Sequence, residues 1–426
     1  MEVKRPRVFY GWWIVGATML VGLYVGGIIV YGFTAIFEPI IDEFGWSYAT
    51  VSFAASLRGA ETGLLEPVVG RFVDRWGSRP IIFVGGLFTA GGLFMLSHTT
   101  SLAMFYGSFI LLAVGMSACG TTSLVTGVAN WFRRRLGLAT GIALCGFGLG
   151  GLVLPAMVAL IAHYGWRPTF DILAAGALIL LLPTSLVFRH RPEDYGYLPD
   201  GRQPAAAPSG QAGATVAPAT IAEPFLTARE AVRTRSFWLL TLAFSVLTAA
   251  NITVVTHVMP YLDSIGVGRV NAGIIATAIP LLSIAGRLGL GALGDRMSRT
   301  WVTIAAFSMM GVGLLCFAAM ASLGPWTLYA FLLLFGVGYG GIVALRPAVA
   351  REYFGRGRFG SIFGLVMGIT AVGGIIGPPL TGRLFDTIGD YRPAWLVFAA
   401  LAMTAACLVL ISRRYRPRLL PPRTQQ

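Results

Sequence analysis

Twelve apolar runs of membrane-spanning length dominate this chain of 426 residues. A helix needs about 20 apolar residues to cross the hydrocarbon core of a bilayer. Charge is correspondingly scarce, because 12% of the residues are charged against about 25% in an ordinary soluble domain. The runs are too long and continuous for barrel strands, so the sequence predicts an all-α integral membrane protein. The predicted spans are residues 10–37, 47–69, 80–97, 102–131, 137–162, 168–188, 236–261, 271–293, 301–321, 326–349, 360–382 and 392–412.

The distribution of cations between the loops predicts the orientation. With the N-terminus inside, 25 of the 32 Lys and Arg residues fall in cytosolic segments, four in outside loops and three within spans. The positive-inside rule demands such an excess, so we expect a multi-pass protein with both termini in the cytoplasm. Lys4 is the only lysine, and this preference for arginine suggests the inner (plasma) membrane of a GC-rich bacterium. The net charge of +14 then reflects topology and contact with membrane lipids, with no nucleic-acid partner.

An internal repeat divides the spans six and six. Residues 70–79 match residues 291–299, residues 131–135 match 353–358, and residues 165–168 match 390–393, at offsets of 221, 222 and 225. We therefore predict a six-helix bundle over residues 1–188, a cytoplasmic linker over 189–235, and a second six-helix bundle with a short basic tail over 236–426. Two parallel repeats place a binding site between them, near the middle of the membrane.

The first copy of the repeat resembles a signature of the major facilitator superfamily. That signature, G-x-x-x-D-[RK]-x-G-[RK]-[RK], is matched by Gly70, Asp74, Arg75, Gly77 and Arg79, whereas Ser78 departs from it. The second copy keeps Asp295 and Arg296 and then departs from the pattern. The resemblance implies twelve transmembrane helices in two pseudo-symmetric bundles and transport by alternating access. It also implies a cytosolic gate made of these residues, in which an acid caps a facing helix N-terminus and cations pair across the halves.

Shorter motifs resemble the monocarboxylate and oxalate:formate porter branch of that family. They are residues 10–12, 44–47, 191–196, 237–238 and 284–291. The resemblance implies a small organic anion whose carboxylate is bound by Arg287. Two positions depart from the proton-coupled members, because Tyr31 replaces a lysine and Ser283 replaces an aspartate. The lysine that the oxalate exchanger carries in span eleven is also absent, which leaves open whether transport is symport, exchange or uniport.

Ionisable residues inside spans cost about 2.5–3.5 kcal/mol on insertion scales, so each is a functional candidate. Arg287 offers a planar fork that fits one carboxylate through two hydrogen bonds. The alternative is a clasp between helices through a buried acid or backbone carbonyls. One arginine favours a monocarboxylate over a dicarboxylate.

The second span carries a further acid–base pair. Arg58 and Glu61 are three residues apart and share a helix face, so Glu61 is the candidate proton carrier and Arg58 a candidate contact of the substrate. The alternative is a permanent ion pair without a role in transport. We assign Glu66 to the region of Asp74, and we expect Arg346 to extend towards the cytosolic surface.

Three uncharged residues complete the predicted substrate site, namely Tyr31, Asn251 and His257. For Tyr31 the alternative is aromatic packing, and for His257 it is a hydrogen-bonded residue between helices. Asn251 and His257 lie six residues apart, so they point about 120° apart on a helix and only one can face the cavity squarely.

Other chemistries find no support in the sequence. There is no catalytic triad, nucleotide loop or metal-binding pattern, and the four cysteines lie in apolar runs without metal or redox spacing. We therefore predict a non-enzymatic secondary transporter of a small organic anion, without cofactor or metal, functional as a monomer and possibly coupled to protons. The competing hypotheses are a major facilitator protein for a drug-like or other metabolite, and a membrane sensor that does not transport.

Overall fold

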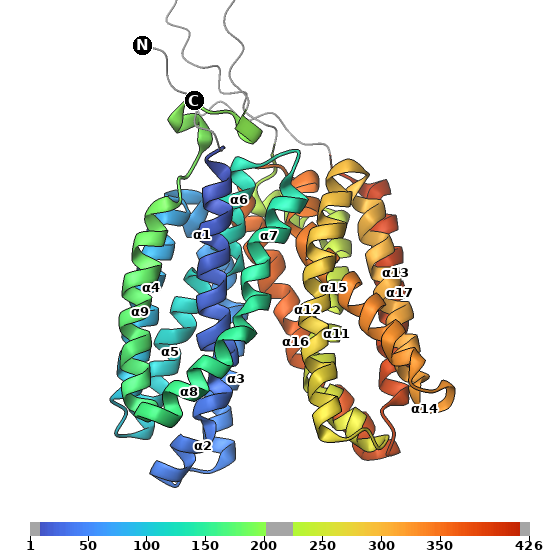
Figure 1. Ribbon diagram of the computed structural model, residues 1–426. Coiled ribbons are helices and arrows are strands. Elements are labelled where there is room, and N and C mark those ends of the chain that lie inside the picture. Colours follow the sequence, from blue (N-terminus) through green and yellow to red (C-terminus); the bar gives the residue numbers. More distant parts are fainter. Residues whose placement is uncertain (1–8, 202–224, 418–426) are drawn as a thin grey trace, which may run out of the picture.

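The computed structural model describes residues 9–201 and 225–417. Within them the secondary structure is helical throughout, in two bundles that stand side by side (Figure 1). The N-terminal bundle contains α1 (Gly11–Tyr24), η1 (Val25–Tyr31), α2 (Phe33–Phe44), α3 (Tyr48–Trp76), α4 (Ser78–Ser97), α5 (Leu102–Ala118), α6 (Thr121–Trp131), α7 (Leu136–Leu149), η2 (Gly150–Val153), α8 (Leu154–Tyr164) and α9 (Trp166–Val187). The C-terminal bundle contains α11 (Arg235–Ser264), α12 (Arg269–Arg296), α13 (Arg299–Ala318), α14 (Met320–Leu323), α15 (Trp326–Phe354), α16 (Phe359–Ile388) and α17 (Arg392–Ser412).

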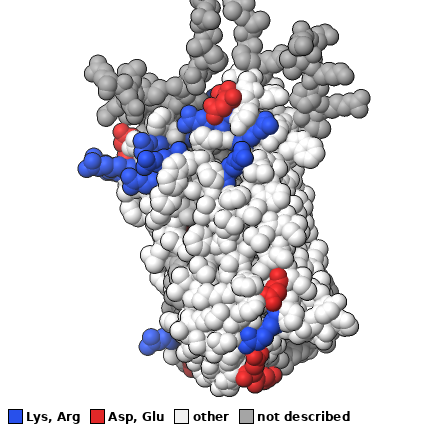
Figure 2. Space-filling view, turned by 90° about the vertical axis from the view of Figure 1, so that its left-hand side faces the viewer, with Lys and Arg blue, Asp and Glu red and all other residues white. Residues whose placement is uncertain are grey.

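These helices confirm the predicted all-α membrane architecture. Eleven helical segments in the described part of the chain are long and apolar enough to cross a membrane. Helix α3 is the twelfth long segment and has 29 residues, about 44 Å at 1.5 Å per residue, but it carries Arg58, Glu61 and Glu66. On the face shown in Figure 2, charged side chains collect at the two ends of the molecule and leave an uncharged band between them. That band matches the hydrocarbon layer of a bilayer.

Three of the predicted spans are interrupted helices. The first contains the π-helical turn η1, the fourth breaks between α5 and α6 at Gly120, whose backbone is extended, and the fifth narrows to the 3-10 turn η2. Pro155 follows η2 and lacks the N–H that would bond to the carbonyl of Gly151 in an α-helix. A hydropathy pattern cannot show such breaks, because the apolar run continues through them.

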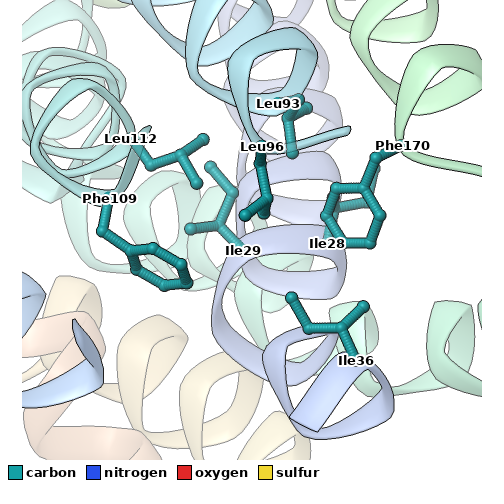
Figure 3. A pocket seen from close by; sticks show the side chains of 8 residues that line it. All are labelled: Ile28, Ile29, Ile36, Leu93, Leu96, Phe109, Leu112 and Phe170. Atoms are coloured by element: carbon teal, nitrogen blue, oxygen red, sulfur yellow. The ribbon is translucent and has the colours of Figure 1, made fainter. Parts of the chain in front are cut away.

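An apolar core holds the interrupted first span inside the N-terminal bundle. The side chains in Figure 3 surround a small void of about 10 Å³ and come from η1, α2, α4, α5 and α9. All of them are hydrocarbon, so this void offers no group that would bind a polar molecule. The lining residues are Ile28, Ile29, Ile36, Leu93, Leu96, Phe109, Leu112 and Phe170.

Two helix pairs join the bundles, and they are related by the internal repeat. Helix α3 packs against α16, and α7 packs against α12. At the first contact a Cβ on Gly364 would collide with the backbone carbonyl of Glu66, and at the second a Cβ on Gly141 would collide with that of Arg287. Glycines therefore allow the backbones of opposite halves to touch at equivalent positions.

Candidate functional site

Two aspartates of the repeated motif bind helix N-termini of the opposite bundle. Asp74 at the end of α3 accepts hydrogen bonds from the backbone N–H groups of Gly360 (2.7 Å) and Ser361 (2.6 Å) at the start of α16. Asp295 at the end of α12 accepts from Gly137 and Leu138 at the start of α7, both at 2.8 Å. The first N–H groups of a helix have no partner within the helix and attract negative charge. The two contacts together close one end of the molecule.

Cations of the C-terminal bundle add contacts to backbone carbonyls of the other half. Arg351 donates to the carbonyls of Ala129 and Phe132 at the end of α6, where a positive charge suits the helix dipole. Arg299 donates to the carbonyl of Arg133 at 2.8 Å. We call these cations and the two aspartates the gate residues: Asp74, Asp295, Arg299 and Arg351.

The sequence prediction named other cations for this gate. Arg75, Arg79 and Arg296 are exposed, and within the described residues no hydrogen bond joins them to the opposite half; Arg75 instead lies 5.7 Å from the ring of Trp76. Each lies in the first or last turn of its helix, where its side chain faces the surface. Gly70 confirms a close approach, because a Cβ there would collide with the carbonyl of Gly360.

The contacts between the halves occupy one end of the molecule. Among the described residues, every hydrogen bond between the bundles lies between the level of Arg287 and the end at which α1 begins and α17 ends, which we call the terminus end. Towards the opposite end the ribbons of the two bundles diverge (Figure 1). This arrangement is closed at the terminus end.

A cavity of about 380 Å³ lies between the bundles and extends from the level of Arg287 away from the terminus end. Helices α7 and α8 and the turn η2 form one wall, and α11, α12 and α15 form the other. Among the described residues that line it, Arg287 is the one charged residue, and Asn251, Thr277 and Tyr339 are the polar ones. The apolar and glycine lining comprises Phe147, Gly148, Gly151, Leu152, Leu154, Val255, Val258, Ala276, Ile279, Pro280 and Leu281.

Arg287 reaches from α12 to the opposite bundle. Its side chain donates a hydrogen bond, at 2.5 Å, to the carbonyl of Leu144 on α7 and also reaches the thiol of Cys145. No carboxylate among the described residues forms an ion pair with it, and its Nε has no hydrogen-bond partner. An arginine carries five N–H donors, so donors remain beyond these contacts, although the side chain as a whole is 5% exposed.

Neighbouring residues fix where this guanidinium lies. A Cβ on Gly148 would come within 2.9 Å of its Nη1 atom, so the glycine makes room for the side chain. One turn before Arg287, Ser283 donates to the carbonyl of Pro280 at 2.7 Å and is fully buried. In the branch that this chain resembles, the position of Ser283 carries an aspartate. Here the position carries a hydroxyl that is already hydrogen-bonded, so Arg287 has no acid one turn before it.

The structure separates the uncharged residues of the predicted site. Asn251 lines the cavity. His257 does not, because its ring nitrogens face the carbonyl of Pro378 (3.0 Å) and the hydroxyl of Tyr391 (3.4 Å). This histidine is thus a residue hydrogen-bonded between helices, the second of the two roles that its sequence position allowed. The side chains of Tyr31, Arg58 and Glu61 lie outside the part of the chain that the structure describes.

One prediction about buried charge changes with the structure, and one is compatible with it. Arg346 does not extend to the surface; it is 7% exposed and packs with its guanidinium 5.9 Å from the ring of Phe363. Glu66 is 4% exposed and lies where α3 meets α16.

Sequence reasoning missed Thr277 and Tyr339. The only sequence signal for Tyr339 is a polar ring between Gly338 and Gly340, within a span. In the described part of the chain, no cluster of metal-ligating side chains is present.

Comparisons with known proteins agree with this architecture. The model of the Major Facilitator Superfamily matches residues 17–288 and 246–426. Among curated relatives, monocarboxylate transporter 4 of Rattus norvegicus is 26% identical over 99% of this chain and 88% of its own length. Monocarboxylate transporter 13 of Bos taurus is 25% identical over 96% of this chain and 91% of its own length.

Solved structures share the fold at low sequence identity. A bacterial homologue of the iron transporter ferroportin, in an outward-facing state, has a TM-score of 0.70 and 14% identity, covering 96% of this chain and 100% of that one. The transporter FucP in the outward conformation has a TM-score of 0.67 and 15% identity over 95% and 99% of the two chains. These relatives are transporters and not enzymes. With the paired helix-capping gate and the cavity between two six-helix bundles, they show that the chain belongs to the major facilitator superfamily of membrane transporters.

Proposed function

We propose that this protein is a secondary active transporter of a small monocarboxylate. The observation that carries the proposal is Arg287, the one charged residue among the described residues that line a cavity between the two bundles, with its Nε unpartnered. A guanidinium binds a carboxylate through two parallel hydrogen bonds. The curated relatives named monocarboxylate transporters support the same substrate class.

The rest of the cavity suits a small, partly apolar anion. Its volume of about 380 Å³ lies near the lower end of the usual range for ligand pockets. Val255, Val258 and Ile279 provide an apolar wall, and Asn251 and Tyr339 add hydrogen-bonding groups. A single guanidinium neutralises one carboxylate, which favours a monocarboxylate over a dicarboxylate.

Transport then proceeds by alternating access. We place the terminus end in the cytosol of a bacterial inner membrane, because the excess of loop cations lies on that side. The described arrangement is outward-facing, and opening of the gate residues would release the anion inwards. Coupling to protons, with Glu61 as one carrier, or exchange against a second anion supplies the driving force.

A second candidate is a transporter for a larger apolar solute. The cavity lining is mostly hydrocarbon and includes Phe147, Leu152 and Leu281, which would bury the surface of such a solute favourably. This candidate predicts that Arg287→Gln keeps transport of an uncharged apolar substrate, whereas the monocarboxylate proposal predicts loss of anion uptake.

The test is uptake of labelled lactate, pyruvate, formate, oxalate and a larger aromatic acid into proteoliposomes, with and without an inward proton gradient. We expect uptake of a monocarboxylate by the unmodified protein and its loss in Arg287→Gln. Arg383→Gln is the matched control, because Arg383 is exposed on α16, away from the cavity.

Three results separate the possibilities. Uptake raised by the gradient indicates proton symport, and uptake only into vesicles preloaded with anion indicates exchange. No uptake of any acid, with a folded protein in the vesicles, refutes the monocarboxylate proposal and leaves the fold intact.

A further inference from the structure

Glu66 and Arg346 bring opposite charges from the two bundles into the same buried region. Glu66 lies on α3 and is 4% exposed, and Arg346 lies on α15 and is 7% exposed. Each acts on the other electrostatically. Among the ion pairs of the described residues, however, none joins them within 4.0 Å. Neither residue lines the cavity that contains Arg287.

The polar atoms around this pair are incompletely satisfied. Arg346 Nε is buried without a hydrogen-bond partner, and the Thr122 hydroxyl is the one hydrogen-bonding side chain that acts on the Glu66 carboxylate among the described residues. Gly120, at the break between α5 and α6, gives the carboxylate its space, because a Cβ there would lie 3.2 Å from Glu66 Oε1. A buried charge that lacks close partners costs several kcal/mol, so this arrangement is a poor choice for stability alone.

Few other charges act on Glu66. The neighbouring helices contribute uncharged residues. Gly364 of α16 lies against the backbone carbonyl of Glu66, and Thr122 of α6 lies near its carboxylate. Arg346 is the one charged group that acts on it among the described residues, and Tyr339 is the other ionisable group near Arg346. The charge state of Glu66 therefore decides whether Glu66 and Arg346 attract each other across the interface between the bundles.

The internal repeat relates Glu66 to a residue of the candidate site. Glu66 is the counterpart of Arg287, at the offset of 221 that relates the two gate aspartates. Each residue precedes its aspartate by eight positions, about 12 Å along the helix. The N-terminal half thus carries an acid where the C-terminal half carries the candidate substrate arginine.

We propose that Glu66 is a proton-coupling carboxyl of the transporter and that Arg346 is its counter-charge; this rests on the proposed function. Opening of the terminus end draws α3 away from α15 and separates the two charges, which costs Coulomb energy in a medium of low polarity. A proton added to the Glu66 carboxylate gives a neutral acid and removes that cost, while no other bond changes. Charged Glu66 therefore holds the gate closed, and protonated Glu66 permits opening and releases its proton to the cytosol.

The first test is independent of substrate and follows hydrogen–deuterium exchange at the start of α16, residues 359–364. The full-length protein and its Glu66→Gln variant are compared at each pH from 5 to 9, so that the intrinsic pH dependence of exchange cancels. We expect the unmodified protein to exchange several-fold more slowly than the variant at high pH and equally fast at low pH. Glu352→Gln is the control, because Glu352 pairs with Arg416 within its own half at 2.8 Å.

Two results would overturn the proposal. Equal exchange at every pH would show that Glu66 does not hold the gate, and a difference that is constant from pH 5 to 9 would show a permanent clasp. The double variant Glu66→Gln/Arg346→Gln removes both charges and should exchange like Glu66→Gln at high pH, whereas Arg346→Gln alone leaves a buried carboxylate and tests for misfolding.

A second test uses proteoliposomes and separates this proposal from the proposed function. Absence of monocarboxylate transport by the unmodified protein refutes the function but not the gate pair, which the exchange experiment tests on its own. With transport present, Glu66→Gln should abolish the stimulation by an inward proton gradient. Stimulation that survives in Glu66→Gln and disappears in Glu61→Gln would assign coupling to Glu61 and refute the role of Glu66.

Discussion

At the scale of single residues, the guanidinium of Arg287 is held by a backbone carbonyl and left without a carboxylate partner among the described residues. A cation with a buried acid beside it would be neutralised and would bind an added anion weakly. Here the backbone contact orients the side chain without cancelling its charge. Intramembrane cations commonly pair with backbone carbonyls, and under the proposed function the uncancelled charge of Arg287 attracts the substrate anion.

The shape of the cation matters as well as its charge. We expect Arg287→Lys to lose monocarboxylate uptake nearly as fully as Arg287→Gln, with at least a tenfold rise in KM, because an ammonium group is a point donor and lacks the planar fork. Uptake kinetics in proteoliposomes measure the effect. Wild-type kinetics in the lysine variant would contradict bidentate recognition.

Gly148 permits a second, gentler test of the same contact. A Cβ at this position would come within 2.9 Å of Arg287 Nη1, so Gly148→Ala should displace the guanidinium and raise KM about fivefold, equivalent to about 1 kcal/mol. Stability should stay equal or rise, because alanine favours a helix more than glycine does.

The control for this change is Gly151→Ala. Gly151 also lines the cavity, but a Cβ there meets no atom within 4 Å. Equal kinetics of the two alanine variants would show that the position of the guanidinium does not limit binding.

At the scale of elements, helix ends make the gate. Asp74 and Asp295 cap the starts of α16 and α7, and Arg351 binds the end of α6. These contacts use backbone groups that every helix leaves unpaired at its ends, so they can form and break without disrupting a helix. Gly77, with a positive φ of +82°, lets α4 follow α3 directly, whereas the second copy has Met297 in an extended conformation at the corresponding turn.

Loss of one aspartate charge should loosen its own contact. We expect Asp74→Asn to speed hydrogen–deuterium exchange at residues 359–363 and Asp295→Asn to do so at residues 136–139. The expected weakening is about 1 kcal/mol each, the usual size of a charge at a helix N-terminus. Asp200→Asn is the control, because Asp200 accepts from the N–H groups of Arg133 and Arg134 within one half. Uniform loosening by all three variants would contradict a specific gate.

At the scale of the whole molecule, the segment after α9 ties the two halves together at the terminus end. Arg356 of the C-terminal half donates to both carboxylate oxygens of Glu193, at 2.5 and 2.9 Å. Burial acts to raise the pKa of Glu193, but the hydrogen bonds and charge of Arg356 outweigh it and hold the pKa below its ordinary value. The ion pair therefore exists over the whole neutral range.

This lowered pKa predicts a pH dependence with a defined sign. Stabilisation by the pair is fully present above the ordinary pKa of a glutamate, about 4.3, and is lost as the pH falls through the lowered value. The unmodified protein should therefore lose about 1 kcal/mol of its stability advantage over Glu193→Gln between pH 6 and 3. Melting curves in detergent measure it. Arg356→Gln should remove the same pH-dependent part, and parallel curves for all three proteins would contradict the prediction.

Much of the fold could be predicted because its signals are local or repeated. Apolar length places the spans, and the nearly constant offset between repeats predicts two similar halves. The interrupted spans could not be read in this way, since η1 and the break at Gly120 lie within unbroken apolar runs. Within the candidate site, Arg287 and Asn251 could be named as polar residues inside spans, but Tyr339 and Thr277 had no charge to mark them.

The sequence by itself determined the class of the protein, the repeat, the gate aspartates and the arginine that stands alone among apolar neighbours. These features follow from composition and from the spacing of residues, both of which can be read from one segment of the chain at a time. Only the tertiary structure decided that Asn251 faces the cavity while His257 bonds between helices, and that Arg346 lies buried with Glu66 instead of reaching the surface. Helical spacing fixes the angle between two side chains, but the packing of neighbouring helices decides what each of them meets.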